Sequence, residues 1–277
     1  MQALFQLDAW DVPFAAAGIW DAAGVLATRG DATRAVRLAS VSKPVSALAV
    51  LIAAEEGVVD LDEPAGPPGA TVRHLLAHAS GHPFDDGPPL AAPGLRRIYS
   101  NDGFRVLGEH VAARAEMRFA EYVRAAVCEP LDLALDPSGH PGAGFHGSLA
   151  DVLAIGRELL RPTLVAPETA EEMRAVQFPG LDGVLPGLGR FSPLDWGLGV
   201  ELKGAKTPHW SGSLTSARTF GHFGGSGTFL WIDPSRDVVC ACLTTREFGP
   251  WAIEAWSRLS DAVIAEASGQ EPPSYGR

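Results

Sequence analysis

The two ends of this chain of 277 residues carry strand patterns, whereas its middle carries helix patterns. Residues 14–30 read as two strands joined by a turn at residues 21–24, and further apolar segments between residues 196 and 245 have the length and composition of strands. Between residues 61 and 160 the apolar residues recur at helical spacing, separated by connectors rich in proline and glycine. This order predicts an antiparallel sheet built from both ends of the chain.

The predicted fold is therefore of the α/β (α+β) class, with a sheet flanked by helices and an inserted, mainly helical lobe. We assign residues 1–60 and 195–277 to the sheet domain, including a terminal helix that starts at Trp251, and residues 61–194 to the lobe. A cleft between the two parts is the natural position for a functional site.

Composition limits the partners and the compartment. The net charge of −11, with no cluster of lysine and arginine longer than the pair Arg96 and Arg97, argues against nucleic-acid binding. Aspartates interrupt residues 1–30, and no apolar stretch reaches roughly eighteen residues, so we expect neither an export signal nor a membrane span, and a cytoplasmic protein. The three cysteines lack metal-type spacing and are expected to be reduced packing residues. The oligomeric state stays open.

The segment LASVSKPVSA, residues 38–47, places Ser40 and Lys43 three positions apart where an apolar helix begins. Positions i and i+3 share a helix face, so the two side chains can form a hydrogen bond, and Pro44 is tolerated in a first turn. A serine hydroxyl needs a base to become a nucleophile, and lysine can be that base when burial lowers its pKa. The alternative is that Ser40 is a helix N-cap and Lys43 a solvated residue of the first turn.

The segment RRIYSNDGF places Tyr99 and Asn101 on the same side of an extended loop, just before a helix that starts near Gly103. Tyr99 could transfer a proton, and Asn101 could hold an amide or ester carbonyl group. The alternative is a turn in which Asn101 or Asp102 is only the N-cap of the helix.

The segment FGHFGGSGTFLWIDP places His222 near the end of one strand and Gly224, Gly225 and Gly227 before the next. Glycines allow a backbone to approach a ligand closely, so an N–H group here could complete an oxyanion hole with the N–H group of Ser40. The alternative is a tight hairpin turn.

In this order, the three segments resemble the penicillin-recognising serine hydrolases, in particular the branch of class C β-lactamases, D-alanyl-D-alanine peptidases and related esterases. The resemblance rests on SVSK, YSN and HFGG, with supporting phrases such as HLLAHASGH and WGLGVEL, and extends from about residue 38 to about residue 248. It implies that Ser40 is the acylated nucleophile, Lys43 its base, Tyr99 a second proton-transfer group and Asn101 the residue that orients a substrate amide.

The glycine-rich segment matches this family and also departs from it. His222, Phe223 and Gly224 stand where many members have Lys-Thr-Gly, and Gly225 would follow that triplet and supply an oxyanion N–H group. The resemblance therefore implies that these four residues bind the substrate. Histidine is neutral for much of the time near pH 7 and phenylalanine has no hydroxyl group, so firm capture of a penicillin carboxylate is not expected. The resemblance and these departures predict an esterase or amidase that needs no cofactor and acts on a small-molecule substrate.

Other functions remain open on the same fold. They are weak β-lactamase or D-amino-acid peptidase activity, acyl transfer to an acceptor other than water, and ligand binding without turnover. Trp210 and Phe248 are candidates for a pocket wall, and the loops at residues 85–93 and 181–194 are expected to set the preference for an acyl group.

Two further patterns are weaker. His74 and His78 have the spacing of zinc ligands on a helix, but Leu75 stands where a metalloprotease has glutamate, so no metal site is predicted. Ser226 lies in GGSGT, where Thr228 replaces the last glycine of a G-x-S-x-G turn, so Ser226 is not expected to be a nucleophile.

Overall fold

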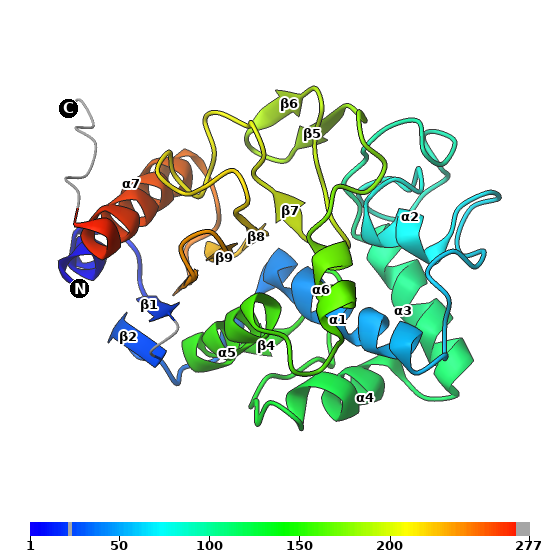
Figure 1. Ribbon diagram of the computed structural model, residues 1–277, viewed down its shortest axis with the longest axis horizontal. Helices are drawn as coiled ribbons and strands as arrows, with labels where there is room; N and C mark the ends of the chain where they lie inside the picture. Colours follow the sequence, from blue (N-terminus) through cyan, green and yellow to red (C-terminus); the bar gives the residue numbers. More distant parts are fainter. Residues whose placement is uncertain (22–23, 270–277) are drawn as a thin grey trace.

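The computed structural model describes residues 1–21 and 24–269, which form an antiparallel sheet with helices on both faces (Figure 1). The strand order is β2-β1-β10-β9-β8-β7, so both ends of the chain contribute to one sheet, and the predicted fold class is confirmed. The turn predicted between β1 and β2 falls partly on residues 22–23, which lie outside the described residues. The strands are β1 (Ala15–Asp21), β2 (Gly24–Arg29), β7 (Glu201–Leu202), β8 (Phe220–Gly224), β9 (Thr228–Asp233) and β10 (Val238–Thr244).

The central strand β10 contributes side chains to two hydrophobic cores. Val239 and Leu243 belong to the core on one face of the sheet, whereas Cys240 and Cys242 belong to the core on the other face. Side chains alternate across a strand, so a strand that is buried on both faces is apolar along its whole length. Both cysteines are buried free thiols, as the sequence predicted.

One face of the sheet carries α7 (Pro250–Ser268) and the N-terminal 3₁₀ helix η1 (Gln2–Ala9), which lie side by side at the left of Figure 1. The backbone N–H groups of Gln2 and Ala3 donate to the carboxylate of Glu266 in α7, each at 2.9 Å. These hydrogen bonds hold η1 against α7.

The other face of the sheet is covered by α5 (Leu149–Leu160), a helix that the sequence interpretation placed in the lobe at residues 61–194. A Cβ atom at Gly156 would lie 2.3 Å from Cγ1 of Val239, so the helix approaches β10 closely because this position has no side chain. In its packing α5 belongs with the sheet, although it falls within the range predicted for the lobe.

The helical lobe lies to the right in Figure 1, and α1 (Ser42–Glu55) runs between it and the sheet. Residues 42–53 of α1 are all buried, which explains why this helix reads as apolar all round. Phe104, Leu107 and Val111 are also fully buried, on the face that their spacing predicted. The lobe contains α2 (Val72–Leu76), α3 (Asp102–Ala115), α4 (Phe119–Val123), the π-helical turn η3 (Arg124–Cys128) and α6 (Pro167–Met173).

Two small strand pairs complete the fold. β3 (Val36–Arg37) pairs with β4 (His146–Gly147), and β5 (Gly183–Leu185) pairs with β6 (Gly189–Phe191). The sequence interpretation treated the second pair as a loop, because strands of three residues are too short to show an alternating pattern. Within residues 1–21 and 24–269, no helix has both the length and the apolar character needed to cross a membrane.

Candidate active site

Ser40 lies in a 3₁₀ turn, η2 (Ala39–Val41), that runs directly into α1, and not in the α-helix itself. Side chains at i and i+3 eclipse one another in a 3₁₀ turn, so the predicted contact remains, with Lys43 Nζ 3.3 Å from Ser40 Oγ. The N-cap of α1 is Val41, so Ser40 is not the capping residue. Ala39 has a φ of 46°, a left-handed conformation that places strained backbone immediately before the hydroxyl.

Lys43 is fully buried, and burial lowers its pKa well below the usual value. Its Nζ atom lies 2.7 Å from Oδ1 of Asn101 and 2.8 Å from the carbonyl oxygen of Gly142. A neutral amine has two N–H groups and one lone pair. The two carbonyl oxygens can accept both N–H groups, which leaves the lone pair for the hydroxyl group of Ser40. Lys43 is therefore placed to act as a base.

Tyr99 lies on the other side of the hydroxyl, and its O–H group donates to Ser40 Oγ at 2.7 Å. Burial raises the pKa of Tyr99 above its usual value, and this effect exceeds the opposing effect of the hydrogen bond to Ser40. The phenol thus stays protonated at neutral pH and can give a proton but is a poor base. Its ring packs against His78 and Trp196, with centroid separations of 4.6 Å and 5.8 Å.

Asn101 directly precedes α3, but its side chain makes no cap hydrogen bond. The hydroxyl oxygen of Ser100 accepts instead, from the N–H group of Gly103 at 2.7 Å. The side chain of Asn101 is thereby left to contact Lys43, so the capping alternative does not describe its role.

Gly142 is a site residue that the sequence interpretation missed. A Cβ atom at this position would lie 3.0 Å from Cβ of Phe104 and 3.3 Å from Nζ of Lys43, so a glycine lets the backbone carbonyl approach the amine. The available signal was the run SGHPGAG at residues 138–144, because clustered glycines can mark a close backbone approach.

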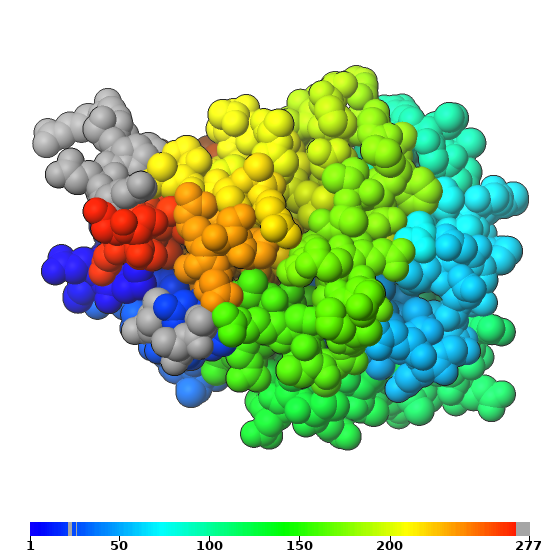
Figure 2. All heavy atoms as spheres, in the orientation of Figure 1, coloured from blue at the N-terminus to red at the C-terminus, as the bar shows by residue number. Residues whose placement is uncertain are grey.

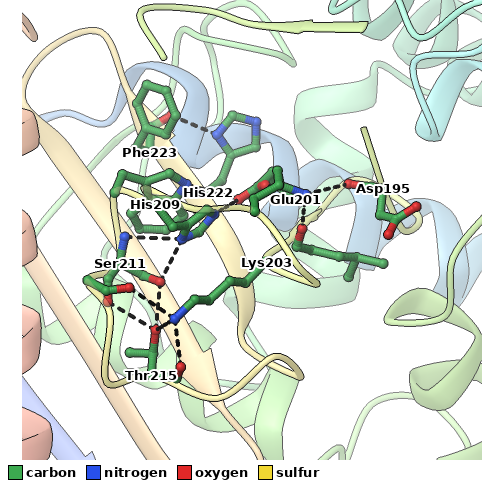
Figure 3. Close-up of polar contacts among 12 residues, drawn as sticks. Asp195, Glu201, Lys203, His209, Ser211, Thr215, His222 and Phe223 are labelled. Carbon is green, nitrogen blue, oxygen red and sulfur yellow. Dashed lines mark hydrogen bonds and ion pairs between the residues drawn. The ribbon is translucent and has the colours of Figure 1, made fainter. Parts of the chain in front are cut away.

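His222 comes from β8 and completes the cluster from the sheet side. Its Nε2 atom lies 3.5 Å from the Tyr99 hydroxyl, and its Nδ1–H group donates to the carbonyl oxygen of Phe223 at 2.7 Å (Figure 3). Burial, followed by the nearby Lys43, lowers the pKa of His222 to about 3. The ring is therefore neutral at physiological pH, and this position carries no cation.

A neutral His222 gives a direct prediction for NMR spectroscopy. With its pKa lowered to about 3, the ring should bind no proton between pH 5 and pH 8, so its nitrogen shifts should stay constant over that range. Free imidazole measured in the same buffers serves as the reference. A His222 titration with a midpoint near 6.5 would contradict the neutral ring.

Phe223 was predicted to contact substrate, but its ring does not face Ser40. It packs against Phe248, Trp210 and Trp256, at centroid separations of 4.8, 5.6 and 6.0 Å. Successive side chains of a strand point to opposite faces, so Phe223 lies on the α7 side whereas His222 lies on the side of Tyr99. Trp210, predicted as a pocket wall, is also a buried core residue.

Gly224, at the end of β8, lies against the turn that holds Ser40, and Gly225 follows it. A Cβ atom at Gly224 would lie 2.4 Å from the carbonyl oxygen of Leu38, and the hydroxyl of Thr228 donates to the same oxygen at 2.8 Å. Gly225 is exposed, and a Cβ atom there would meet nothing within 4 Å. The backbone of Gly225 therefore borders open space next to the turn of Ser40, where an oxyanion would need a donor.

A buried polar network lies beside His222, centred on Glu201 of β7 (Figure 3). One carboxylate oxygen accepts from His209 at 2.8 Å and from Trp210 at 2.9 Å, and the other lies 2.9 Å from Nζ of Lys206. Burial acts to raise the pKa of Glu201, but His209 and Lys206 outweigh it and hold that pKa at about 2. These contacts hold the segment that contains Lys206 and His209 against β7, the edge strand of the sheet.

Ser211, His209 and Glu201 are arranged like a hydrolytic triad within this network. The Ser211 hydroxyl lies 2.7 Å from Nδ1 of His209. Ser211 is fully buried, however, and its hydroxyl also contacts that of Thr215 at 3.0 Å. No substrate can reach it, so the role of these residues is structural.

The remaining polar candidates have local partners. His74 contacts the hydroxyl of Thr71 at 2.9 Å, and buried His78 accepts from the N–H group of Ser100 at 3.2 Å. The hydroxyl of Ser226 donates to a backbone carbonyl oxygen at 2.7 Å. Across the described ranges, no cluster of three or more His, Cys, Asp or Glu residues could hold a metal ion.

Comparisons with known proteins bear on the family and the fold of this chain. The family model described as Beta-lactamase matches residues 8–135 and 133–263. The chain is also similar to the solved structure of a beta-lactamase (Mb2281c) from Mycobacterium bovis, with 52% sequence identity, a TM-score of 0.93, and coverage of 96% of this chain and 99% of that one. The search of curated proteins gave no match.

More distant structures share the fold. EstCE1, described as a hydrolase with promiscuous acyltransferase activity, has 19% identity and a TM-score of 0.75, with coverage of 95% of this chain and 96% of that one. Simvastatin synthase (LovD6 mutant) from Aspergillus terreus has 17% identity and a TM-score of 0.75, with coverage of 96% and 93%.

Proposed function

Since this chain belongs to the beta-lactamase family, whose members are serine hydrolases, we propose that it cleaves a carboxylic ester or amide through an acyl-enzyme on Ser40. The observation that carries the proposal is the convergence of two proton-transfer groups on one hydroxyl. Lys43 Nζ and Tyr99 O–H lie 3.3 Å and 2.7 Å from Ser40 Oγ. The resemblance in SVSK and YSN assigns the same three residues.

In the acylation step, the hydroxyl proton of Ser40 passes to the neutral amine of Lys43 while Oγ bonds to the substrate carbonyl carbon. The carbonyl oxygen becomes an oxyanion, which the backbone N–H groups of Ser40 and Gly225 stabilise. The tetrahedral intermediate then expels the alcohol or amine. The leaving group takes a proton from the Tyr99 phenol, which regains one from the Lys43 ammonium.

In the deacylation step, a water molecule takes the place of the leaving group beside Tyr99 and Lys43. One of its protons passes to Lys43 as its oxygen bonds to the acyl carbon, and the collapse of the second tetrahedral intermediate returns a proton to Ser40. The products are the carboxylic acid and the original hydroxyl. The protons in this cycle move among three side chains, the leaving group and water.

The neutral state of His222 favours esters and amides over penicillins as substrates. A β-lactam antibiotic carries a carboxylate, and the neutral imidazole with a pKa of about 3 offers this group no positive charge. The next side chain, Phe223, is turned into the core. We therefore rank esterase or amidase activity above β-lactamase activity, which remains the second candidate because the 52% identical structure is described as a beta-lactamase.

Intact-mass measurement after treatment with a fluorophosphonate tests the nucleophile. The native protein should gain one adduct, and Ser40→Ala should gain none. Ser226→Ala is the matched control, because Ser226 lies on the adjacent glycine turn and should leave labelling unchanged. A native protein without an adduct would favour a binding function, and an adduct on Ser40→Ala would identify a different nucleophile.

Substrate class is tested by comparing p-nitrophenyl esters with a chromogenic cephalosporin under the same conditions. We expect kcat/KM for the best ester to exceed that for the cephalosporin by at least about a hundredfold, since the position of His222 offers no positive charge to the antibiotic carboxylate. A higher value for the cephalosporin would reverse the ranking of the two activities.

A further inference from the structure

A pocket of about 290 Å³ opens directly beside Tyr99, between the segment that precedes this residue and the β5–β6 hairpin. Both views show these two segments side by side at the upper edge of the molecule (Figures 1 and 2). The backbone N–H group of Arg97 donates to the carbonyl oxygen of Asp182 at 2.8 Å, which joins the two walls. Tyr99 contacts Ser40, so a group bound in this pocket would be continuous with the reacting bond.

The walls of the pocket present apolar side chains to solvent. Phe84, Leu90 and Val184 line it and are 48%, 63% and 55% exposed. They are among the few large apolar residues that the described part of the chain leaves exposed. Side chains alternate along β5, so the next residue, Leu185, is buried while Val184 faces outward. Exposed apolar residues that gather in a concave site indicate an apolar ligand.

The rim of the pocket carries positive charge. Arg96 and Arg190 both line it, and both are exposed. Asp182 lies 3.3 Å from Arg190 and offsets one of the two charges. The pocket therefore has a net positive rim in a protein whose overall net charge is −11. The third arginine, Arg97, is not available to a ligand, because its buried guanidinium group donates to backbone carbonyl oxygens.

We propose that this pocket selects substrates in which an apolar arm ends in a carboxylate, with the arm lying along Phe84, Leu90 and Val184 and the carboxylate held by Arg96 and Arg190. The inference rests on the proposed hydrolysis at Ser40 and defines its substrate class. An arginine fork binds a carboxylate through paired N–H groups, whereas the apolar walls gain from each methylene group that leaves water. The arm belongs either to the acyl group or to the alcohol of the ester.

Two series of esters test whether the arm belongs to the acyl group or to the alcohol. The acyl series pairs mono-p-nitrophenyl esters of hexanedioic and octanedioic acid with p-nitrophenyl hexanoate and octanoate. The alcohol series pairs the acetyl esters of 6-hydroxyhexanoic and 8-hydroxyoctanoic acid with hexyl and octyl acetate and is followed by titration of the released acid. The effect should appear in the series whose arm reaches the pocket. In that series, kcat/KM should rise about threefold per methylene group, and each charged ester should exceed its neutral partner by about tenfold.

Variants of the rim test the charge. Arg96→Ala and Arg190→Ala should each reduce the charged-to-neutral ratio of kcat/KM by about fivefold, and Asp182→Asn should raise it by a similar factor because it removes the offsetting carboxylate. Arg124→Ala is the matched control, since Arg124 is an exposed arginine of the helical lobe that lies outside the pocket. The ratio should be unchanged in this control.

Variants of the wall test the apolar arm. Val184→Ser should weaken the dependence of kcat/KM on chain length, whereas Val25→Ser, an equally exposed valine on β2, should not. The proposal is overturned if neutral esters exceed charged ones in both series, or if the rim variants leave the ratio unchanged.

The pocket can also be tested without catalysis. Monomethyl hexanedioate should bind to Ser40→Ala in saturation-transfer NMR, and the additional change Arg190→Ala should reduce that binding. A native protein that hydrolyses no ester and does not react with the fluorophosphonate would contradict the proposed function. The NMR binding measurement would still show whether the pocket binds an apolar arm with a carboxylate. Hydrolysis of short esters without any preference for charge would contradict the pocket alone.

Discussion

Replacement of Lys43 by methionine is expected to lower kcat/KM for the best ester by about 10²–10⁴-fold, the contribution of a positioned general base. The variant removes the amine that lies 3.3 Å from Ser40 Oγ and keeps a long apolar stem in a fully buried position. Methionine also removes the cost of burying a polar amine, so the melting temperature should stay the same or rise. The fluorophosphonate reaction of Ser40 should slow in parallel.

The matched control for Lys43→Met is Lys203→Met. Lys203 is a second buried lysine, and its Nζ atom contacts the carbonyl oxygen and the hydroxyl of Thr215 at 2.6 Å and 2.8 Å. This variant should lose stability, but the activity per folded molecule should stay within a few-fold of the native value. Equal losses of activity in both variants would show that burial of any lysine, and not its contact with Ser40, supports catalysis.

The native enzyme should also show a pH dependence that Lys43 explains. Burial lowers the pKa of Lys43, and only the neutral amine can accept the proton of Ser40. The value of kcat/KM should therefore rise as the pH increases through this lowered pKa and stay level above it, until the ester hydrolyses spontaneously. A fall in kcat/KM over that range would contradict a neutral lysine base.

The second large effect is on stability. Glu201→Gln should lower the free energy of unfolding by about 3–5 kcal/mol, because it leaves the buried Lys206 without its carboxylate partner. For a chain of this length the change corresponds to about 5–9 °C in the melting temperature. Glu158→Gln is the matched control, since the carboxylate of Glu158 is also buried but accepts from Thr163 and the N–H group of Leu164 and contacts no cation in the described structure. Its cost should be about 1–2 kcal/mol.

Lowering the pH should remove the stabilisation that the ionised Glu201 gives the native protein. The folded pKa of Glu201 is about 2, below its usual value of 4.5, so its stabilising effect is complete above pH 4.5 and is lost as the pH falls towards 2. The melting temperature of the native protein should therefore converge on that of Glu201→Gln in this window. A constant difference between the two from pH 6 to pH 2 would contradict a charged Glu201.

Spacing within short segments predicted much of the candidate site. SVSK and YSN identified Ser40, Lys43, Tyr99 and Asn101, which the fold brings together from η2, α1 and the segment before α3. These residues could be found because a three-residue or two-residue separation already places side chains on one side of a turn or loop. The packing of Phe223 could not be predicted in the same way, because its ring contacts with Trp210 and Phe248 join segments far apart in the chain.

The amino-acid sequence by itself determined the fold class and the contact between Ser40 and Lys43, because both follow from local periodicity. Only the tertiary structure decided the protonation states, since the burial of Lys43, Tyr99 and His222 depends on segments far apart in the chain. It also decided that the carbonyl of Gly142 reaches the amine and that three apolar side chains and two arginines surround one pocket. The spacing of residues in the sequence does not predict contacts between such distant segments, because these contacts result from the packing of the helical lobe against the sheet.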